Sequence, residues 1–266
     1  MRANDFFDAH PVFTHGEFVS VHTNSGRSKQ TSNTLLRNHR KSGRLQRIRR
    51  GLYAVVPRGA DPKTAPIDPY KVATKLADDA VVAYHGALQF HGKAASISRR
   101  FHYLTRKRGR AFTFRGSEFV PVQAPPSVRG LPDLGGGVIE QAHADGFVRV
   151  STLERTLVDV MDSPDKGGGW EEIWRSLELI EFFDIEAVIQ YTRKLGSAVA
   201  AARVGFFLDR HREALMIEDH HLAELRELAP KEPRYFDSKR RPGRFVPAWN
   251  LVVPEPILSR AWEGLP

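Results

Sequence analysis

The chain has 266 residues, of which 41% are hydrophobic and 27% charged, a balance typical of folded proteins that excludes an intrinsically disordered chain. It contains no cysteine, which excludes disulfides and thiolate metal sites. No apolar run reaches the length of a membrane span, and the first residues lack the apolar core of a signal peptide, so we expect a cytoplasmic protein with no membrane partner.

The positive charge is unevenly distributed along the chain. Residues 1–60 contain 11 lysines and arginines against 3 acidic residues, so they carry +8 of the total net charge of +9. Residues 61–266 are nearly neutral. A basic segment of this kind predicts a polyanionic partner. At this length we expect two domains, covering residues 1–60 and 61–266.

The start of the chain predicts two short helices. The first covers about residues 3–9. The second covers about residues 15–22, because Thr14 and Glu17 have the spacing of a capping box. A turn that ends at Gly26 follows, and a third helix comes after it. Two helices joined by a glycine-containing turn indicate a helix-turn-helix, although two helices of an ordinary small bundle have the same pattern.

Residues 29–41 predict the helix that enters the DNA major groove. Ser28 is its expected N-cap, and Gly43 lies just past its end. Winding the segment at 100° per residue puts cations and amides on one exposed stripe. The opposite, narrower stripe contains Thr31, Leu35, Asn38 and His39. Cations bind phosphates or guanine, and amides bind adenine. The predicted major-groove contacts are Lys29, Gln30, Asn33, Arg37 and Arg40, with Arg27 and Lys41 as further DNA-binding residues.

Residues 45–55 predict two short strands around a turn at Gly51, which can adopt a positive φ. Three arginines lie on this hairpin: Arg47, Arg49 and Arg50. We expect them to hold the DNA backbone or the adjacent minor groove. A helix followed by a basic hairpin is the pattern of a winged helix-turn-helix, so the predicted partner is double-stranded DNA.

The remaining sequence predicts a larger mixed α/β domain, which makes the fold class α/β (α+β). Residues 57–69 contain four prolines and form the predicted domain boundary. The expected helices cover about 69–78, 153–160, 170–180, 185–195, 197–215 and 220–228, with a last short helix ending near Trp262. The expected strands are antiparallel strands within 99–122, two strands near 138–142 and 146–150, and two strands within 233–253.

Two basic turns have no assigned role. The turn at residues 106–110 is either a solvated loop or a contact to DNA or an acidic partner. The turn at residues 239–244 resembles a hairpin connection. For the turn at residues 106–110, the solvated loop and the contact to a partner both stay open.

We expect no catalytic residues, no metal and no cofactor. His220 and His221 follow Asp219, but neighbouring side chains on a helix diverge and no third metal ligand is evident. Ser151 and Glu154 have capping-box spacing, which accounts for Glu154 without a catalytic pair with Asp159.

A metal-dependent nuclease remains the enzymatic alternative. Asp165, Asp237 and Lys239 can be aligned with the pattern of two magnesium-binding carboxylates and a lysine. Asp165 falls in a glycine-rich turn and Lys239 in a basic hairpin, whereas such a site needs rigid strands.

Five segments in order resemble the AbiEi family, the antitoxins and transcriptional regulators of type IV (AbiE-type) toxin–antitoxin phage-defence systems. These segments are RLQRIRRGLYAV at 44–55, LADDAVVAYHGALQFHG at 76–92, RVSTLERTLVD at 149–159, GGGWEEIWRSLE at 167–178 and WNLVVPE at 249–255. The resemblance extends over nearly the whole chain.

The resemblance implies a non-enzymatic winged-helix protein that represses its own operon. It also implies a larger α/β domain that counteracts a nucleotidyltransferase-like toxin without forming a stable complex with it. A transcription factor whose second domain senses a ligand or mediates oligomerisation is the other alternative, and an adjacent nucleotidyltransferase-like reading frame would favour the antitoxin.

Overall fold

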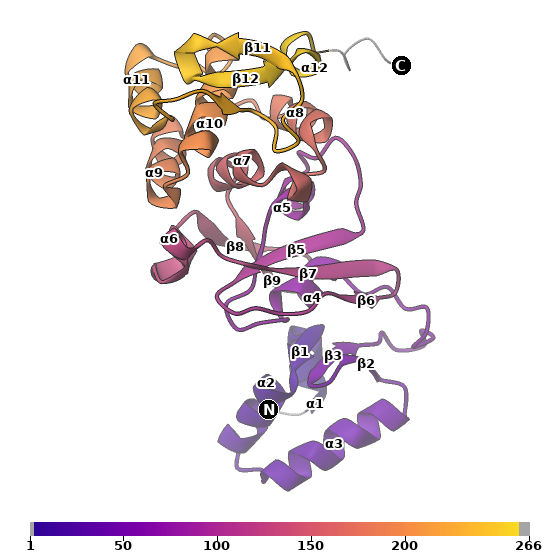
Figure 1. Ribbon diagram of the computed structural model, residues 1–266. Helices are drawn as coiled ribbons and strands as arrows, with labels where there is room; N and C mark the ends of the chain where they lie inside the picture. Colours follow the sequence, from indigo (N-terminus) through magenta and orange to yellow (C-terminus); the bar gives the residue numbers. More distant parts are fainter. Residues whose placement is uncertain (1–2, 261–266) are drawn as a thin grey trace.

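The computed structural model describes residues 3–260 and has three parts along its length (Figure 1). A winged-helix domain forms one end, a six-stranded sheet lies in the middle, and helices with a small sheet form the other end. The predicted mixed α/β fold class is confirmed. The last described helix is α12 (Glu255–Leu258), and the predicted helix end near Trp262 lies outside the described residues.

The winged-helix domain contains three helices and a three-stranded sheet of order β1-β3-β2. Its elements are α1 (Ala3–Ala9), β1 (Val12–Thr14), α2 (His15–Asn24), α3 (Lys29–Lys41), β2 (Leu45–Arg49) and β3 (Leu52–Val55). The capping box of Thr14 and Glu17 is present at the start of α2. Strand β1 was not predicted, because three residues are too few to show an alternating pattern; it is a strand only through its antiparallel pairing with β3.

The core of this domain is mostly aromatic. Rings of Phe6, Phe13 and Phe18 meet edge to face, with centroids 5.1 and 5.2 Å from that of Phe6. Such contacts between fully buried rings stabilise a small domain beyond the area they remove from water. The buried apolar residues of this core are Phe6, Phe7, Phe13, Phe18, Leu36 and Leu45.

The buried side of α3 is rotated from the predicted one. Ser32 and Leu36 are buried, whereas Thr31 and Asn38 are exposed. Leu36 packs into the aromatic core, and Ser32 tolerates burial because its hydroxyl donates to the carbonyl of Ser28 over 3.1 Å. The predicted positions of Thr31 and Asn38 were therefore wrong.

The central sheet has the order β6-β7-β5-β4-β9-β8. Its strands are β4 (Val81–Val82), β5 (Arg100–Thr105), β6 (Phe112–Phe114), β7 (Ser117–Gln123), β8 (Val138–Ala142) and β9 (Phe147–Ser151). Strands β5 and β7 are parallel, which contradicts the predicted antiparallel arrangement. Strand β6 lies between them in the chain and forms a hairpin with β7 on its outer side, so β7 returns beside β5 in the same direction.

The two faces of the sheet are covered by different layers. Helix α4 (Pro69–Thr74), capped by Asp68, lies on the face that meets the winged-helix domain, and α5 (His85–Phe90) and α7 (Leu153–Asp162) lie on the other (Figure 1). The core under α4 also contains Val12, Leu52 and Ala54 of the winged-helix domain. One hydrophobic core therefore crosses the predicted boundary at residues 57–69.

Polar contacts also join the winged-helix domain to the sheet. Arg115 lies in the β6–β7 turn with φ +50°, followed by Gly116 with φ +74°, the backbone of a two-residue hairpin turn. Its guanidinium donates to the backbone carbonyls of Pro62 and Ala65 and to the side chain of Gln46 on β2. A single arginine thus ties the wing, the linker and the sheet together.

The remaining elements lie beside the central sheet (α6) or in the layer farthest from the winged-helix domain (Figure 1). They are α6 (Pro126–Arg129), α8 (Trp170–Glu178), α9 (Ile185–Leu195), α10 (Ala198–Arg210), α11 (Asp219–Leu228) and a sheet of β10 (Arg234–Tyr235), β12 (Leu251–Pro254) and β11 (Gly243–Val246). The N-cap of α7 is Thr152 rather than the predicted Ser151: Thr152 Oγ1 accepts from the backbone N–H of Arg155, and the Ser151 hydroxyl bonds to Thr156.

Candidate nucleic-acid interface

Helix α3 lies at the end of the molecule that is farthest from the second small sheet (Figure 1). Its N-terminus is capped by Ser28, whose hydroxyl accepts from the backbone N–H of Thr31 over 3.1 Å. Gly43 follows its end with φ +76°, as predicted for a helix stop. Arg40 and Lys41 occupy the last turn, where cations interact favourably with the helix dipole.

The predicted DNA-binding side chains are accessible. Arg27 is half-buried, and the following are exposed: Lys29, Gln30, Asn33, Arg37, Arg40, Lys41, Arg47, Arg49 and Arg50. Of the acidic residues in this domain, Asp8 pairs with Arg44 and Glu17 pairs with Lys75 on α4. Within residues 3–260, no carboxylate lies within 4.0 Å of the α3 cations. Their charge is therefore available to a polyanion.

The Asn33 side chain is positioned by a hydrogen bond from His15, which was not among the predicted site residues. Nε2 of His15, at the first position of α2, donates to Oδ1 of Asn33 over 2.7 Å. The contact fixes which end of the amide is oxygen and leaves the NH₂ group to point elsewhere. His15 lies 18 residues away, and no sequence signal links it to Asn33.

The wing is short and irregular. Strands β2 and β3 are antiparallel, with a bulge between Arg47 and Arg49 and a turn at Gly51, which has φ +79°. After this bulge, the Arg49 guanidinium donates to the Leu76 carbonyl and lies 5.6 Å from the centroid of the Phe112 ring. Arg49 is therefore also a contact between the wing and the sheet.

The sequence of this region matches a known family. Residues 1–56 match the family model described as "Transcriptional regulator, AbiEi antitoxin". We call the matched winged-helix domain the AbiEi domain. The predicted family resemblance is confirmed for this part of the chain, because the matched residues are those of the winged helix, from α1 to β3.

A solved structure shares the fold of the AbiEi domain and of the rest of the chain together. The crystal structure of the RV2827C protein from Mycobacterium tuberculosis superposes with a TM-score of 0.59 at 19% sequence identity, and the match covers 94% of this chain and 89% of that one. A likeness at this identity shows the fold alone. A search of curated proteins finds no significant match.

Outside the AbiEi domain, the structure brings Glu186 to the two histidines that were predicted to lack a third metal ligand. Glu186 Oε1 lies 3.7 Å from His220 Nε2 and 3.4 Å from His221 Nε2. However, His221 Nδ1 accepts from the backbone N–H of Glu218 over 3.1 Å, so the proton of the neutral ring is on Nε2. That nitrogen has no lone pair to offer a metal, and the arrangement fits a helix cap with a neighbouring carboxylate.

Of the residues of the nuclease alternative, Asp237 has structural partners. Asp237 accepts from the backbone N–H of Lys239 over 3.2 Å and from Arg241 Nε over 2.5 Å. Burial opposes ionisation, but these hydrogen bonds and the nearby cations hold the pKa of Asp237 below its usual range. Asp165 is exposed in a single 3₁₀ turn (Pro164–Lys166). Asp237 thus fixes the basic turn at residues 239–244.

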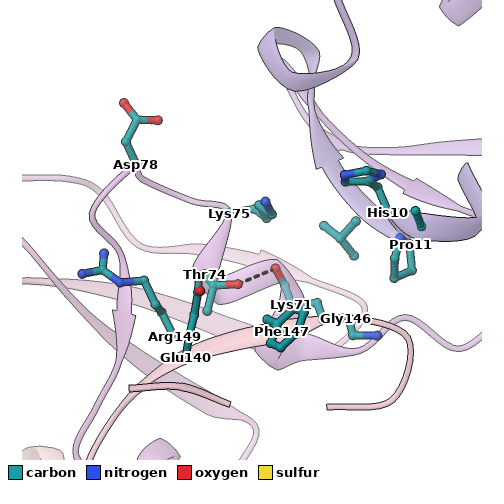
Figure 2. Close-up of a pocket in the computed structure, with 12 residues that line it drawn as sticks. His10, Pro11, Lys71, Thr74, Lys75, Asp78, Glu140, Gly146, Phe147 and Arg149 are labelled. Carbon is teal, nitrogen blue, oxygen red and sulfur yellow. Dashed lines mark hydrogen bonds between the residues drawn. The ribbon is translucent and has the colours of Figure 1, made fainter. Parts of the chain in front are cut away.

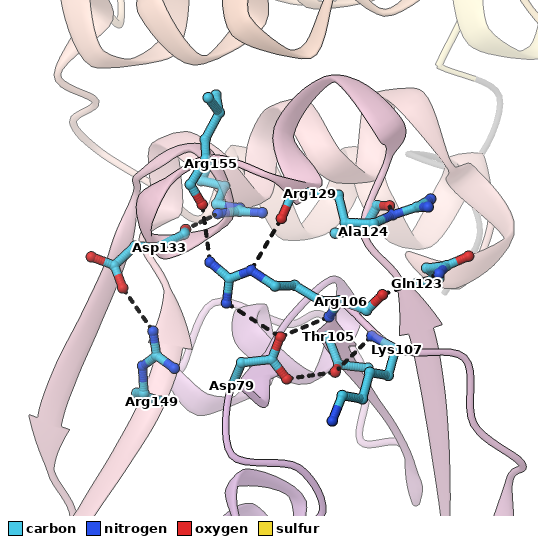
Figure 3. A network of polar contacts seen from close by, with 11 residues as sticks. Asp79, Thr105, Arg106, Lys107, Gln123, Ala124, Arg129, Asp133, Arg149 and Arg155 are labelled. Carbon is cyan, nitrogen blue, oxygen red and sulfur yellow. Dashed lines mark hydrogen bonds and ion pairs between the residues drawn. The ribbon is translucent and has the colours of Figure 1, made fainter.

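The other basic turn is anchored at its first residue. Figure 3 shows the Arg106 side chain between Asp79 and the α6 region. Its guanidinium donates to the carbonyls of Arg129 and Leu131 at 3.1 and 3.0 Å and lies 3.4 Å from Asp79. Lys107 and Arg110 are exposed. Arg106 therefore has a structural role, and the rest of the turn faces solvent.

No helix among residues 3–260 has both the length and the apolar composition that crossing a bilayer requires.

Proposed function

We propose that this protein is a DNA-binding antitoxin that represses its own operon and counteracts a nucleotidyltransferase-like toxin. One observation carries the proposal: the AbiEi domain presents on α3 an exposed stripe of cations and amides with no carboxylate partner in the described chain. Lys29, Gln30, Asn33, Arg37 and Arg40 lie in the major groove. Arg27 and Lys41 contact phosphates near the two ends of the helix, and Arg47 and Arg50 contact them from the wing.

Replacement of Asn33 or Arg37 by alanine is expected to cost about 1–3 kcal/mol of DNA-binding free energy, which is about 5- to 150-fold in Kd. Both side chains are proposed to read bases, so sequence preference should relax as well. The measurement is fluorescence anisotropy of the full-length protein with the duplex upstream of its own gene and with a shuffled duplex.

Arg193→Ala is the matched control, because Arg193 is an exposed arginine on α9, in the layer away from the winged helix. It should leave DNA affinity unchanged. Arg47→Ala should weaken both duplexes equally and reduce the slope of log K against log salt by about one. Unchanged binding by both the Asn33 and Arg37 variants would contradict the assignment of α3.

The antitoxin activity is tested separately from DNA binding. The full chain and its Asn33→Ala/Arg37→Ala variant are co-expressed with the neighbouring toxin from a heterologous promoter, and growth is measured. If residues 61–266, which we call the body, counteract the toxin, both proteins should restore growth. Failure of the wild-type chain to restore growth would leave a transcriptional regulator without antitoxin activity.

A further inference from the structure

A cavity of about 450 Å³ lies between the AbiEi domain and the body (Figure 2). One wall is the segment that joins α1 to β1, including His10 and Pro11. The opposite wall is made by α4, β8 and β9. Figure 2 shows His10 and Pro11 across the cavity from Lys71, Thr74 and Phe147. The volume is within the range of small-molecule sites in proteins.

Lys71 is the most unusual residue of the cavity. It lies on α4, is only 6% exposed, and packs beside Gly146, where an added Cβ would lie 3.8 Å from its Cε. Within residues 3–260, no carboxylate lies within 4.0 Å of its ammonium group. The nearest candidate by sequence, Asp68, is engaged by the backbone N–H of Tyr70 and by His143.

The other cations of the cavity differ from Lys71 in this respect. Lys75 pairs with Glu17, and Arg149 pairs with Asp133 over 2.8 Å. The Lys71 ammonium group therefore has no counter-charge from the described part of the chain. An anion in the cavity would supply that counter-charge.

The cavity also contains an aromatic side chain that the fold does not bury. Phe147, at the start of β9, is 66% exposed. Exposed aromatic rings beside cationic groups are the usual platforms for nucleobases, which stack on them. Asp78 and Glu140 lie at the same cavity and offer carboxylate oxygens to hydroxyl or amino groups. Figure 2 shows Asp78 well separated from Lys71, so it would not repel an anion bound there.

We propose that this cavity binds a mononucleotide, with the phosphate on Lys71 and the base on Phe147. The ligand would touch both the AbiEi domain and the body. This site is separate from the α3 surface, and its test does not depend on DNA binding.

The test is thermal denaturation and isothermal titration calorimetry of the full-length protein with the four ribonucleoside monophosphates, the matching nucleosides and inorganic phosphate. At least one nucleoside monophosphate should raise Tm and bind. The nucleoside and inorganic phosphate should each bind at least tenfold more weakly, because each lacks one of the two groups that the cavity recognises.

Two variants and a control make the result specific. Lys71→Met should abolish the response to nucleotide. Phe147→Ala should leave Tm unchanged and weaken nucleotide binding at least fivefold, and because Phe147 is exposed this variant should fold normally. Lys107→Met removes an exposed lysine elsewhere and should bind as the wild type does.

Three results would overturn the proposal. The first is the absence of both heat and a Tm shift with every nucleoside monophosphate at millimolar concentration. The second is equal binding of inorganic phosphate and nucleotide. The third is an undiminished response in Lys71→Met.

Discussion

Replacing Arg155 by methionine is expected to lower the free energy of unfolding by about 3–5 kcal/mol, the loss typical of breaking one side of a buried ion pair. Arg155 is fully buried on α7. Its Nε donates to Asp159 over 3.2 Å, and its Nη1 donates to the carbonyls of Asp133 and Gly136 at 3.2 and 2.6 Å. Figure 3 shows Arg155 beside Asp133 at this junction. Urea unfolding at neutral pH measures the loss.

The cause of the loss is the carboxylate that is left behind. Burial raises the pKa of Asp159, and Arg155 opposes that effect. Methionine has a similar shape but no charge, so Asp159 would stay buried with the Tyr191 hydroxyl, 2.8 Å away, as its only side-chain donor among residues 3–260. Adding Asp159→Asn to Arg155→Met should recover more than half of the lost stability, because the amide still accepts from Tyr191 and carries no charge.

A matched surface pair provides the control for this prediction. Arg193 and Glu224 lie 2.9 Å apart, but both are exposed to solvent. Arg193→Met should therefore cost less than about 1 kcal/mol. An equal loss in Arg155→Met and Arg193→Met would show that burial does not govern the strength of these pairs.

His102 is expected to make the protein sensitive to mild acid. It lies on β5, is 6% exposed, and has a buried Nδ1 with no hydrogen-bond partner in the described chain. Burial, together with the nearby Arg100, Lys166 and His85, lowers its pKa to about 4. In the unfolded chain its pKa returns to about 6.5.

The sign of the effect follows from proton binding. Between pH 6.5 and about 4, the unfolded chain binds a proton at His102 that the folded protein does not bind, so acid favours unfolding in this window. The loss attributable to this group is about 3 kcal/mol. The measurement is urea unfolding of the wild type and of His102→Phe at pH 7, 5.5 and 4. The variant should lose about 3 kcal/mol less than the wild type over this range, and identical losses would contradict the prediction.

Local signals in the sequence were sufficient for the winged helix. The caps at Thr14 and Ser28 and the glycines at 43 and 51 fixed the ends of its helices and its turn, because each acts on its own few residues. The exposed stripe of α3 followed from the same helical period. The buried stripe was misplaced because the packing of Leu36 against phenylalanines distant in sequence decides which side of α3 faces inward. Ser32 can also be buried there, because its hydroxyl donates a hydrogen bond to the backbone of Ser28, four residues earlier.

The contacts between distant segments could not be predicted from one sequence. The parallel pairing of β5 and β7 depends on where β6 folds. The His15–Asn33 hydrogen bond and the contacts of Arg115 join residues whose sequence spacing follows no pattern. The burial of Lys71 likewise leaves no mark on the sequence. The candidate DNA surface was therefore predictable, and its supporting contacts and the cavity behind it were not.

The hydrophobic core shared by the winged-helix domain and the central sheet affects whether domains can be exchanged between related proteins. Val12, Leu52 and Ala54 pack against α4 and the central sheet. A chimaera joined at residue 57 would place a foreign winged helix against α4 and the central sheet, and the apolar side chains of the two parts would no longer be complementary. A chimaera that receives only the exposed positions of α3 keeps every contact of this core. If α3 reads DNA as proposed, a new sequence preference is thus more readily acquired by grafting a few helix residues than by swapping whole domains.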